Sequence, residues 1–133
     1  MNDAARFGIE HACERLIKRF AQLNDAHDHD ALAEMFVSEG SFARPTDPTN
    51  PVTGREDIRA FFRDRPKRIT RHVMTNIVVE VLDENAACAR SYVVLYSGEK
   101  GAQVLLGDFD DTFRRDDDGA WKFQSRAGSL AFG

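Results

Sequence analysis

Four strand-like segments fill the second half of the chain and constrain its fold more than any other feature. They cover residues 69–82, 89–96, 104–115 and 121–132. In the first of them apolar and polar side chains alternate, which is the period of a strand with one buried face. Only short turns rich in Asp, Gly, Asn and Ser separate the segments. Strands joined in this way pair antiparallel, so the sequence predicts a meander of three consecutive hairpins.

Two helices are predicted ahead of this sheet. Over residues 3–24, apolar side chains recur at spacings of three and four, and charged side chains take the opposite face. A second helix is predicted over residues 30–36, with Asp28 or His29 as its N-cap. We expect Gly40 to end it, because glycine readily adopts the backbone conformation that follows a helix.

A proline-rich loop separates these helices from a third one. A short strand is predicted over residues 41–43, and three of the four prolines follow within residues 44–52, which excludes a helix there. Thr53 and Glu56 have the spacing of a capping box, in which each side chain bonds the other residue's backbone amide. The helix that begins there must stop before Pro66.

These elements predict a single α+β domain over residues 1–133, with three N-terminal helices packed on a curved antiparallel sheet in the shape of a cone. A concave sheet covered by helices leaves an interior that suits a small apolar ligand. We expect Val73, Ile77 and Val79 on the convex side, where a monomer would leave them partly in water. A homodimer or homotrimer is therefore expected.

Charge and motifs exclude several classes of function. The formal net charge is −4, whereas nucleic-acid binding needs a basic stripe. The sequence has no phosphate-binding loop, dinucleotide fingerprint or nucleophile elbow, so we expect no cofactor. It also has no signal peptide and no apolar run of membrane-spanning length, so we expect a cytoplasmic protein that binds no membrane. One basic segment, Arg63–Arg68 with Arg71, is either a solvated loop or a phosphate-binding or substrate-steering surface.

Asp25 and His72 are the main candidates for catalysis. Asp25 lies where the first helix ends, and His72 lies near the start of the first long strand. A carboxylate that orients an imidazole and stabilises its charged form makes it a tuned general base. Asp25 could also cap the second helix. Met74 and Asn76 share the His72 face, and Asn76 could bond either a substrate oxygen or a backbone group.

Four further residues are candidates for substrate binding: Phe20, Tyr92, Phe109 and Arg126. The hydroxyl of Tyr92 or Tyr96 could donate to a developing oxyanion. Arg126 could pair with an acidic sheet residue such as Asp111, or anchor a substrate. The two phenylalanines add apolar bulk either to the core or to the wall of a cavity.

A metal site is not expected. His27 and His29 flank Asp28, but their rings would point in different directions at a helix start. No third ligand follows at a useful spacing.

Together these segments resemble a SnoaL-like domain of the nuclear transport factor 2-like superfamily, whose fold is the cystatin-like α+β cone. Their order and spacing over nearly the whole chain carry the resemblance, rather than any single motif. The matching segments are residues 25–32 with Phe36, 54–58 with Phe61 and Phe62, 71–73 with Asn76, 107–113, and 119–123.

Within that superfamily the chain is similar to scytalone dehydratase and hexachlorocyclohexane dehydrochlorinase, where an Asp ending the first helix polarises a His on the next long strand. Asp25 and His72 match these positions. The chain departs from the dehydratase pattern because residues 89–96 contain no second histidine. It also ends without the relatives' C-terminal tail, so the pocket would be open, or closed by residues 44–52 or a neighbouring subunit.

The resemblance implies a cofactor-independent lyase or isomerase that acts on a small hydrophobic, cyclic molecule. Asp25 and His72 would form its general base. The same superfamily also implies two alternatives. One is a non-catalytic domain that binds a small ligand, and the other is an accessory subunit resembling the small subunit of ring-hydroxylating dioxygenases.

Overall fold

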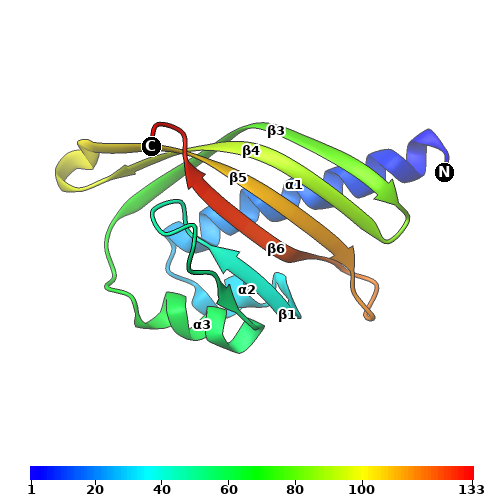
Figure 1. Cartoon of the computed structure of the whole chain (residues 1–133), viewed down its shortest axis with the longest axis horizontal. Coiled ribbons are helices and arrows are strands. Elements are labelled where there is room, and N and C mark those ends of the chain that lie inside the picture. Colours follow the sequence, from blue (N-terminus) through cyan, green and yellow to red (C-terminus); the bar gives the residue numbers. More distant parts are fainter.

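The computed structural model describes residues 1–133 and contains three α-helices, one short 3-10 helix and six strands (Figure 1). In chain order the elements are α1 (Asp3–Asp25), α2 (His29–Ala33), β1 (Phe36–Ala43), β2 (Val52–Thr53), α3 (Arg55–Asp64), β3 (Thr70–Asp83), β4 (Ala86–Ser97), η1 (Glu99–Gly101), β5 (Gln103–Arg115) and β6 (Trp121–Leu130). Helix α1 runs behind the sheet in the view of Figure 1, and α2 and α3 lie together beside β1.

The six strands form one curved, mixed sheet in the order β2-β1-β6-β5-β4-β3. The predicted meander is confirmed, because β3, β4, β5 and β6 pair antiparallel in succession. The prediction of a wholly antiparallel sheet is wrong. Strand β1 pairs with β6 in parallel, with Phe42 opposite Arg126. This pairing is possible because residues 44–120, which include α3 and strands β3 to β5, lie between the two strands in the chain and provide the crossover.

The segment after α2 also differs from the sequence prediction. Residues 36–43 form β1, so the second helix does not continue to Gly40. Pairing with β6 buries the apolar ends of this segment, which outweighs its weak helix propensity. Thr53 lies in β2 rather than at the helix cap, and Gly54 takes the N-cap position with a φ of +96°.

The core lies between α1 and the concave side of the sheet. Asn2 caps α1 by accepting a hydrogen bond from the Ala5 N–H at 2.8 Å. The buried face of the helix carries Ile9, Cys13, Ile17 and Phe20. The Phe20 ring packs against four other phenylalanine rings at centroid distances between 5.6 and 6.1 Å: Phe36, Phe42, Phe62 and Phe123.

Strand β3 contains a bulge that reverses its alternation. Its pairing with β4 shifts by one residue around Asn76, which has a φ of +51°. Before the bulge His72 and Met74 face the helices, and after it Ile77 and Val79 do. The prediction that Ile77 and Val79 lie on the convex side is therefore wrong, because one extra residue moves every later side chain to the other face.

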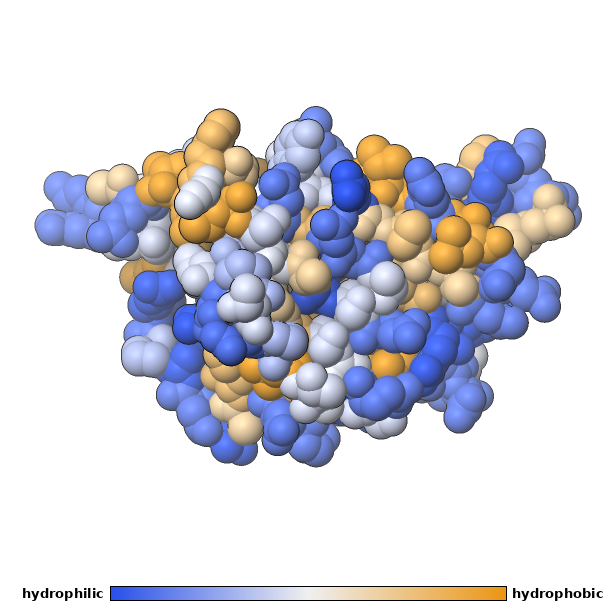
Figure 2. Space-filling view, in the orientation of Figure 1, coloured by the Kyte–Doolittle hydropathy of each residue, from blue (hydrophilic) through white to orange (hydrophobic).

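The outer face of the sheet exposes apolar side chains, and Figure 2 shows them in patches over the upper strands. Exposed residues of this face are Val73, Val78, Tyr92, Tyr96 and Leu106. The predicted exposure of Val73 is confirmed. None of the helices combines the length and the apolar character needed to span a membrane.

Candidate active site

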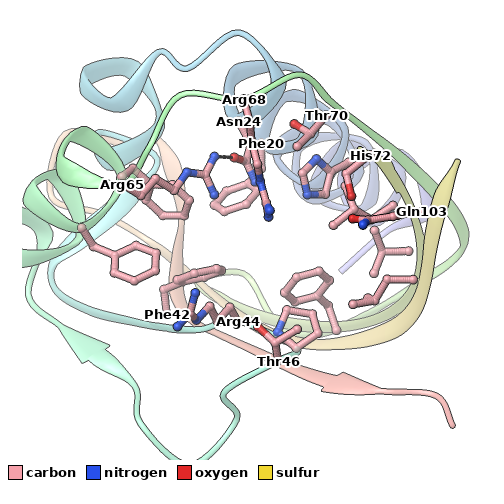
Figure 3. A pocket seen from close by; sticks show the side chains of 18 of the residues that line it. Phe20, Asn24, Phe42, Arg44, Thr46, Arg65, Arg68, Thr70, His72 and Gln103 are labelled. Atoms are coloured by element: carbon pink, nitrogen blue, oxygen red, sulfur yellow. Dashed lines mark hydrogen bonds between the residues drawn. The ribbon is translucent and has the colours of Figure 1, made fainter. Parts of the chain in front are cut away.

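A cavity of about 520 Å³ opens between the end of α1, helix α3 and the concave side of β3, β4 and β5. This volume lies within the range of natural small-molecule pockets, roughly 300–1,000 Å³. In Figure 3 the side chains of Arg65, Asn24 and His72 line one side of the cavity, and those of Phe42 and Arg44 line the opposite side. Its apolar wall comes mainly from Phe20, Phe42, Phe61, Phe62, Val93, Leu105 and Phe109.

Asp25, the last residue of α1, ties this helix to the start of β3. Its Oδ1 lies 2.6 Å from His72 Nδ1, and its Oδ2 accepts the His72 backbone N–H at 3.0 Å. The Thr70 hydroxyl donates to Oδ1 at 3.0 Å. Capping of α2 belongs to Asp28, whose side chain accepts from the Ala31 N–H. Of the two uses predicted for Asp25, the structure therefore shows the contact with His72.

The hydrogen bond to Asp25 decides which ring nitrogen of His72 is free. An ionised carboxylate only accepts, so Nδ1 carries the proton and Nε2 keeps its lone pair. His72 lines the cavity, and its Nε2 forms no hydrogen bond within the chain. Burial lowers the pKa of His72, although Asp25 acts in the opposite direction, and the nearby charge of Arg65 lowers it further. The imidazole is therefore neutral and able to accept a proton at neutral pH.

Arg126, on β6, lies wholly buried beneath the cavity. Its Nε donates to Asp111 Oδ1 at 3.0 Å, which is one of the two roles predicted for it. The guanidinium carbon lies 4.0 Å from the ring centroid of Phe109 and 4.5 Å from that of Phe20, as in cation–π contacts. Nη1 and Nη2 have no hydrogen-bond partner. Burial raises the pKa of Asp111 to about 6, against the attraction of Arg126.

The other predicted site residues divide between the two faces of the sheet. Phe20 and Phe109 line the cavity. Met74 faces the same side but packs against the core. Asn76 and Tyr92 do not lie with His72: both are exposed and line a groove on the outer face. The bulge at Asn76 turns its side chain outward, and Tyr92 pairs with Thr75, which precedes the bulge on the outer face.

Several cavity residues were not predicted as site residues. Thr70 and Asn24 are buried polar residues of the lining. The alternation of β3 places Thr70 on the His72 face, so that signal was available. Arg65 and Arg68 belong to the basic segment whose role the sequence left open, and both line the cavity.

The start of the proline-rich loop is held in the cavity wall by close packing on the sheet. Arg44, Pro45 and Thr46 line the cavity. A Cβ on Gly128 would lie 2.6 Å from the Pro45 nitrogen, so this position accepts only glycine while the loop keeps its place. Residues 44–52 were one of three possibilities for what closes the pocket, and the structure places the first three of them in its lining.

The family can be decided from the sequence match. A family model for the SnoaL-like domain matches residues 7–127. The chain belongs to the SnoaL-like domain family. The recognition made from the sequence is therefore confirmed. No curated protein matches the sequence of this SnoaL-like chain.

Solved structures show the same fold as this SnoaL-like domain. LinA superposes with a TM-score of 0.86 at 20% identity, covering 99% of this chain and 92% of its own. A proposed scytalone dehydratase from Novosphingobium aromaticivorans has a TM-score of 0.84 at 24% identity, with 98% and 89% covered. An NTF2-like protein with a cystatin-like fold from the same organism has a TM-score of 0.80 at 26% identity, with 98% and 88% covered.

Proposed function

We propose that this SnoaL-like domain is a cofactor-independent lyase or isomerase that removes a proton from a small hydrophobic, cyclic molecule. The observation that carries the proposal is the neutral His72 ring in the cavity wall, with Nδ1 held by Asp25 and Nε2 free. Its fold, shared with a proposed scytalone dehydratase, supports elimination chemistry.

His72 Nε2 takes a proton from a carbon next to an electron-withdrawing group. The electron pair of the broken C–H bond becomes a carbon–carbon double bond, and a hydroxide or halide leaves the neighbouring carbon with its own electron pair. In an isomerisation the proton returns at another carbon instead. Asp25 stabilises the imidazolium that forms, and Phe20 and Phe109 contact the apolar body of the substrate.

The test is a turnover assay on cyclic β-hydroxyketones and chlorinated cyclohexanes, followed by enone absorbance and chloride release. His72→Gln removes the base and is expected to lower turnover by about 10²–10⁴-fold. His11→Gln, an exposed position on α1, is the matched control and should leave turnover unchanged. Unchanged melting temperatures would show that both variants fold.

Three results would overturn the proposal. Full turnover in His72→Gln would show that His72 is not the general base. Compounds that bind without turnover throughout the panel would favour the alternative of a ligand-binding domain. Purification with a larger oxygenase chain would favour the accessory-subunit alternative, because such a subunit works only with its partner.

A further inference from the structure

The charged residues of the cavity are all basic. Three arginines line it, Arg44, Arg65 and Arg68, and none of its 20 lining residues is Asp or Glu. The chain as a whole has the opposite balance, with a formal net charge of −4. The cavity lining thus concentrates positive charge on an acidic protein, and such a lining attracts ligands of negative charge.

Arg65 extends from the end of α3 along the cavity wall. Its guanidinium donates to the Asn24 side chain and lies 4.9 Å from the ring centroid of Phe62. Both contacts are to uncharged groups, and they fix the direction of the side chain. Arg65 is half-buried, so its charge has lost part of its hydration without gaining a carboxylate.

The preceding arginines on α3 are different. Arg59 contacts the carboxylates of Asp30, Glu34 and Glu56, and Arg63 pairs with Asp64 at 2.8 Å. Each of these two arginines therefore has an acidic partner within the chain. Arg65 has none. Arg65 thus enters the cavity without an acidic partner, as expected where a ligand supplies one, whereas Arg44 of the same lining lies 4.0 Å from Asp47.

The arginines also act on each other and on His72. Burial lowers the pKa of Arg65, and the charges of Arg68 and Arg44 lower it further, against the attraction of the Asp25 carboxylate. The charge of Arg65 in turn lowers the pKa of His72. A bound anion would relieve this repulsion and make His72 a stronger base at the moment when the substrate is present.

We propose that the cavity binds a small cyclic or aromatic carboxylate, whose carboxylate pairs with Arg65 while its ring lies against the phenylalanines of the wall. Arg65 offers a planar fork of donors that suits a carboxylate, and Arg68 and Arg44 add attraction at the rim. This inference rests on the proposed function, because it names the substrate class of the same site.

Equilibrium binding tests the inference without turnover. The probes are cyclohexanecarboxylate, benzoate and trans-cinnamate, each compared by calorimetry with its own uncharged primary amide. Wild-type protein is expected to bind the carboxylates about tenfold more tightly than the amides. Arg65→Gln should abolish this preference, while Arg63→Gln, which removes an equal charge outside the cavity, should retain it. Arg68→Gln should reduce it, and provides the second variant if Arg65→Gln fails to fold.

Three outcomes would overturn the inference. In the first, no carboxylate of the panel binds more tightly than its amide. In the second, the preference survives in Arg65→Gln. In the third, inorganic phosphate binds more tightly than every carboxylate, which would show that the arginines of the cavity form a phosphate site.

The same titrations in His72→Gln separate this inference from the proposed function. A carboxylate preference without turnover in any variant leaves the substrate class standing and removes the lyase. Turnover of uncharged compounds that depends on His72 but not on Arg65 would support the lyase and remove the proposed carboxylate substrate class.

Discussion

Asp25 and His72 are 47 positions apart, and one carboxylate holds both the ring and the backbone of the histidine. The contact with the ring sets the tautomer of the imidazole. The contact with the backbone fixes the start of β3 against the end of α1. Free rotation of the imidazole would break the 2.6 Å bond. The base is thus oriented before a ligand enters, which is how positioned groups lower a barrier.

Loss of the Asp25 charge should weaken the base. Asp25 raises the pKa of His72 against the effect of burial. Asp25→Asn is therefore expected to lower that pKa further, because the imidazolium loses its carboxylate. Titration of the His72 ring protons by NMR measures this, with Asp28→Asn as the control. An unchanged or raised pKa in Asp25→Asn would contradict the contact.

Activity should depend on the protonation of His72. Its pKa lies below the ordinary value of 6.5, so kcat/KM is expected to rise with pH through that lowered pKa and to be constant at neutral pH. The contribution of His72 to the free energy of unfolding also increases with pH. The unfolded chain binds the proton at the ordinary pKa, so the contribution of His72 is lost as pH falls below about 6.5. A pH profile that still rises above pH 7 would contradict a neutral base.

Neighbouring aspartates on β5 should differ strongly in their effect on stability. Asp111→Ala leaves the buried Arg126 charge without its carboxylate, which typically costs about 3–5 kcal/mol. Asp110, which pairs with Arg90 at the surface, is the matched control, and Asp110→Ala should cost less than about 1 kcal/mol. Urea denaturation measures both. Equal losses would mean that the buried pair contributes no more than a surface pair.

A methyl group on Gly128 should displace the cavity wall. Its Cβ would lie 2.6 Å from the Pro45 nitrogen, so Gly128→Ala is expected to cost about 1–3 kcal/mol. It should also weaken ligand binding, because Arg44 and Thr46 move with the loop. Gly8→Ala, on α1 with no atom within 4 Å, should instead stabilise by about 0.5–1 kcal/mol. Similar effects of the two substitutions would show that the loop moves freely.

The exposed apolar outer face should support self-association. We expect a homodimer or homotrimer, because Val78 and Tyr92 remain exposed on this face. Val78→Lys should weaken the assembly, whereas His11→Lys on α1 should not. Light scattering over a dilution series measures the mass. A monomer at every concentration would leave the outer face without this role.

The sequence predicted those parts of the fold that depend on local signals. Turn residues and alternation gave the meander, and the helical period gave α1 and hence the position of Asp25. The bulge at Asn76 escaped prediction because Val73 and Ile77 are four positions apart and both apolar. In a regular strand they would lie on the same face, so the alternation looks unbroken. Only the register with β4 reveals the extra residue. Asparagine, which tolerates a positive φ, was its one local sign.

The role of the cavity arginines could not be predicted from the local sequence either. Residues 63–68 look like a solvated basic segment, and Arg63 behaves as one. Whether Arg65 meets water or a cavity depends on where α1 ends relative to α3, through the contact with Asn24. That is a tertiary relation with no periodic signal. The parallel pairing of β1 with β6 escaped for the same reason, since partners so distant in the chain leave no local pattern.

The bulge in β3 divides one strand into two segments under separate selection. Substitutions before residue 76 change what the ligand meets, while substitutions after it change how firmly α1 is held. A new specificity can therefore arise at the first end without loosening the second. If Asn76 were instead paired in a regular ladder, every side chain beyond it would move to the opposite face of the sheet, and the two segments could not both keep their buried residues.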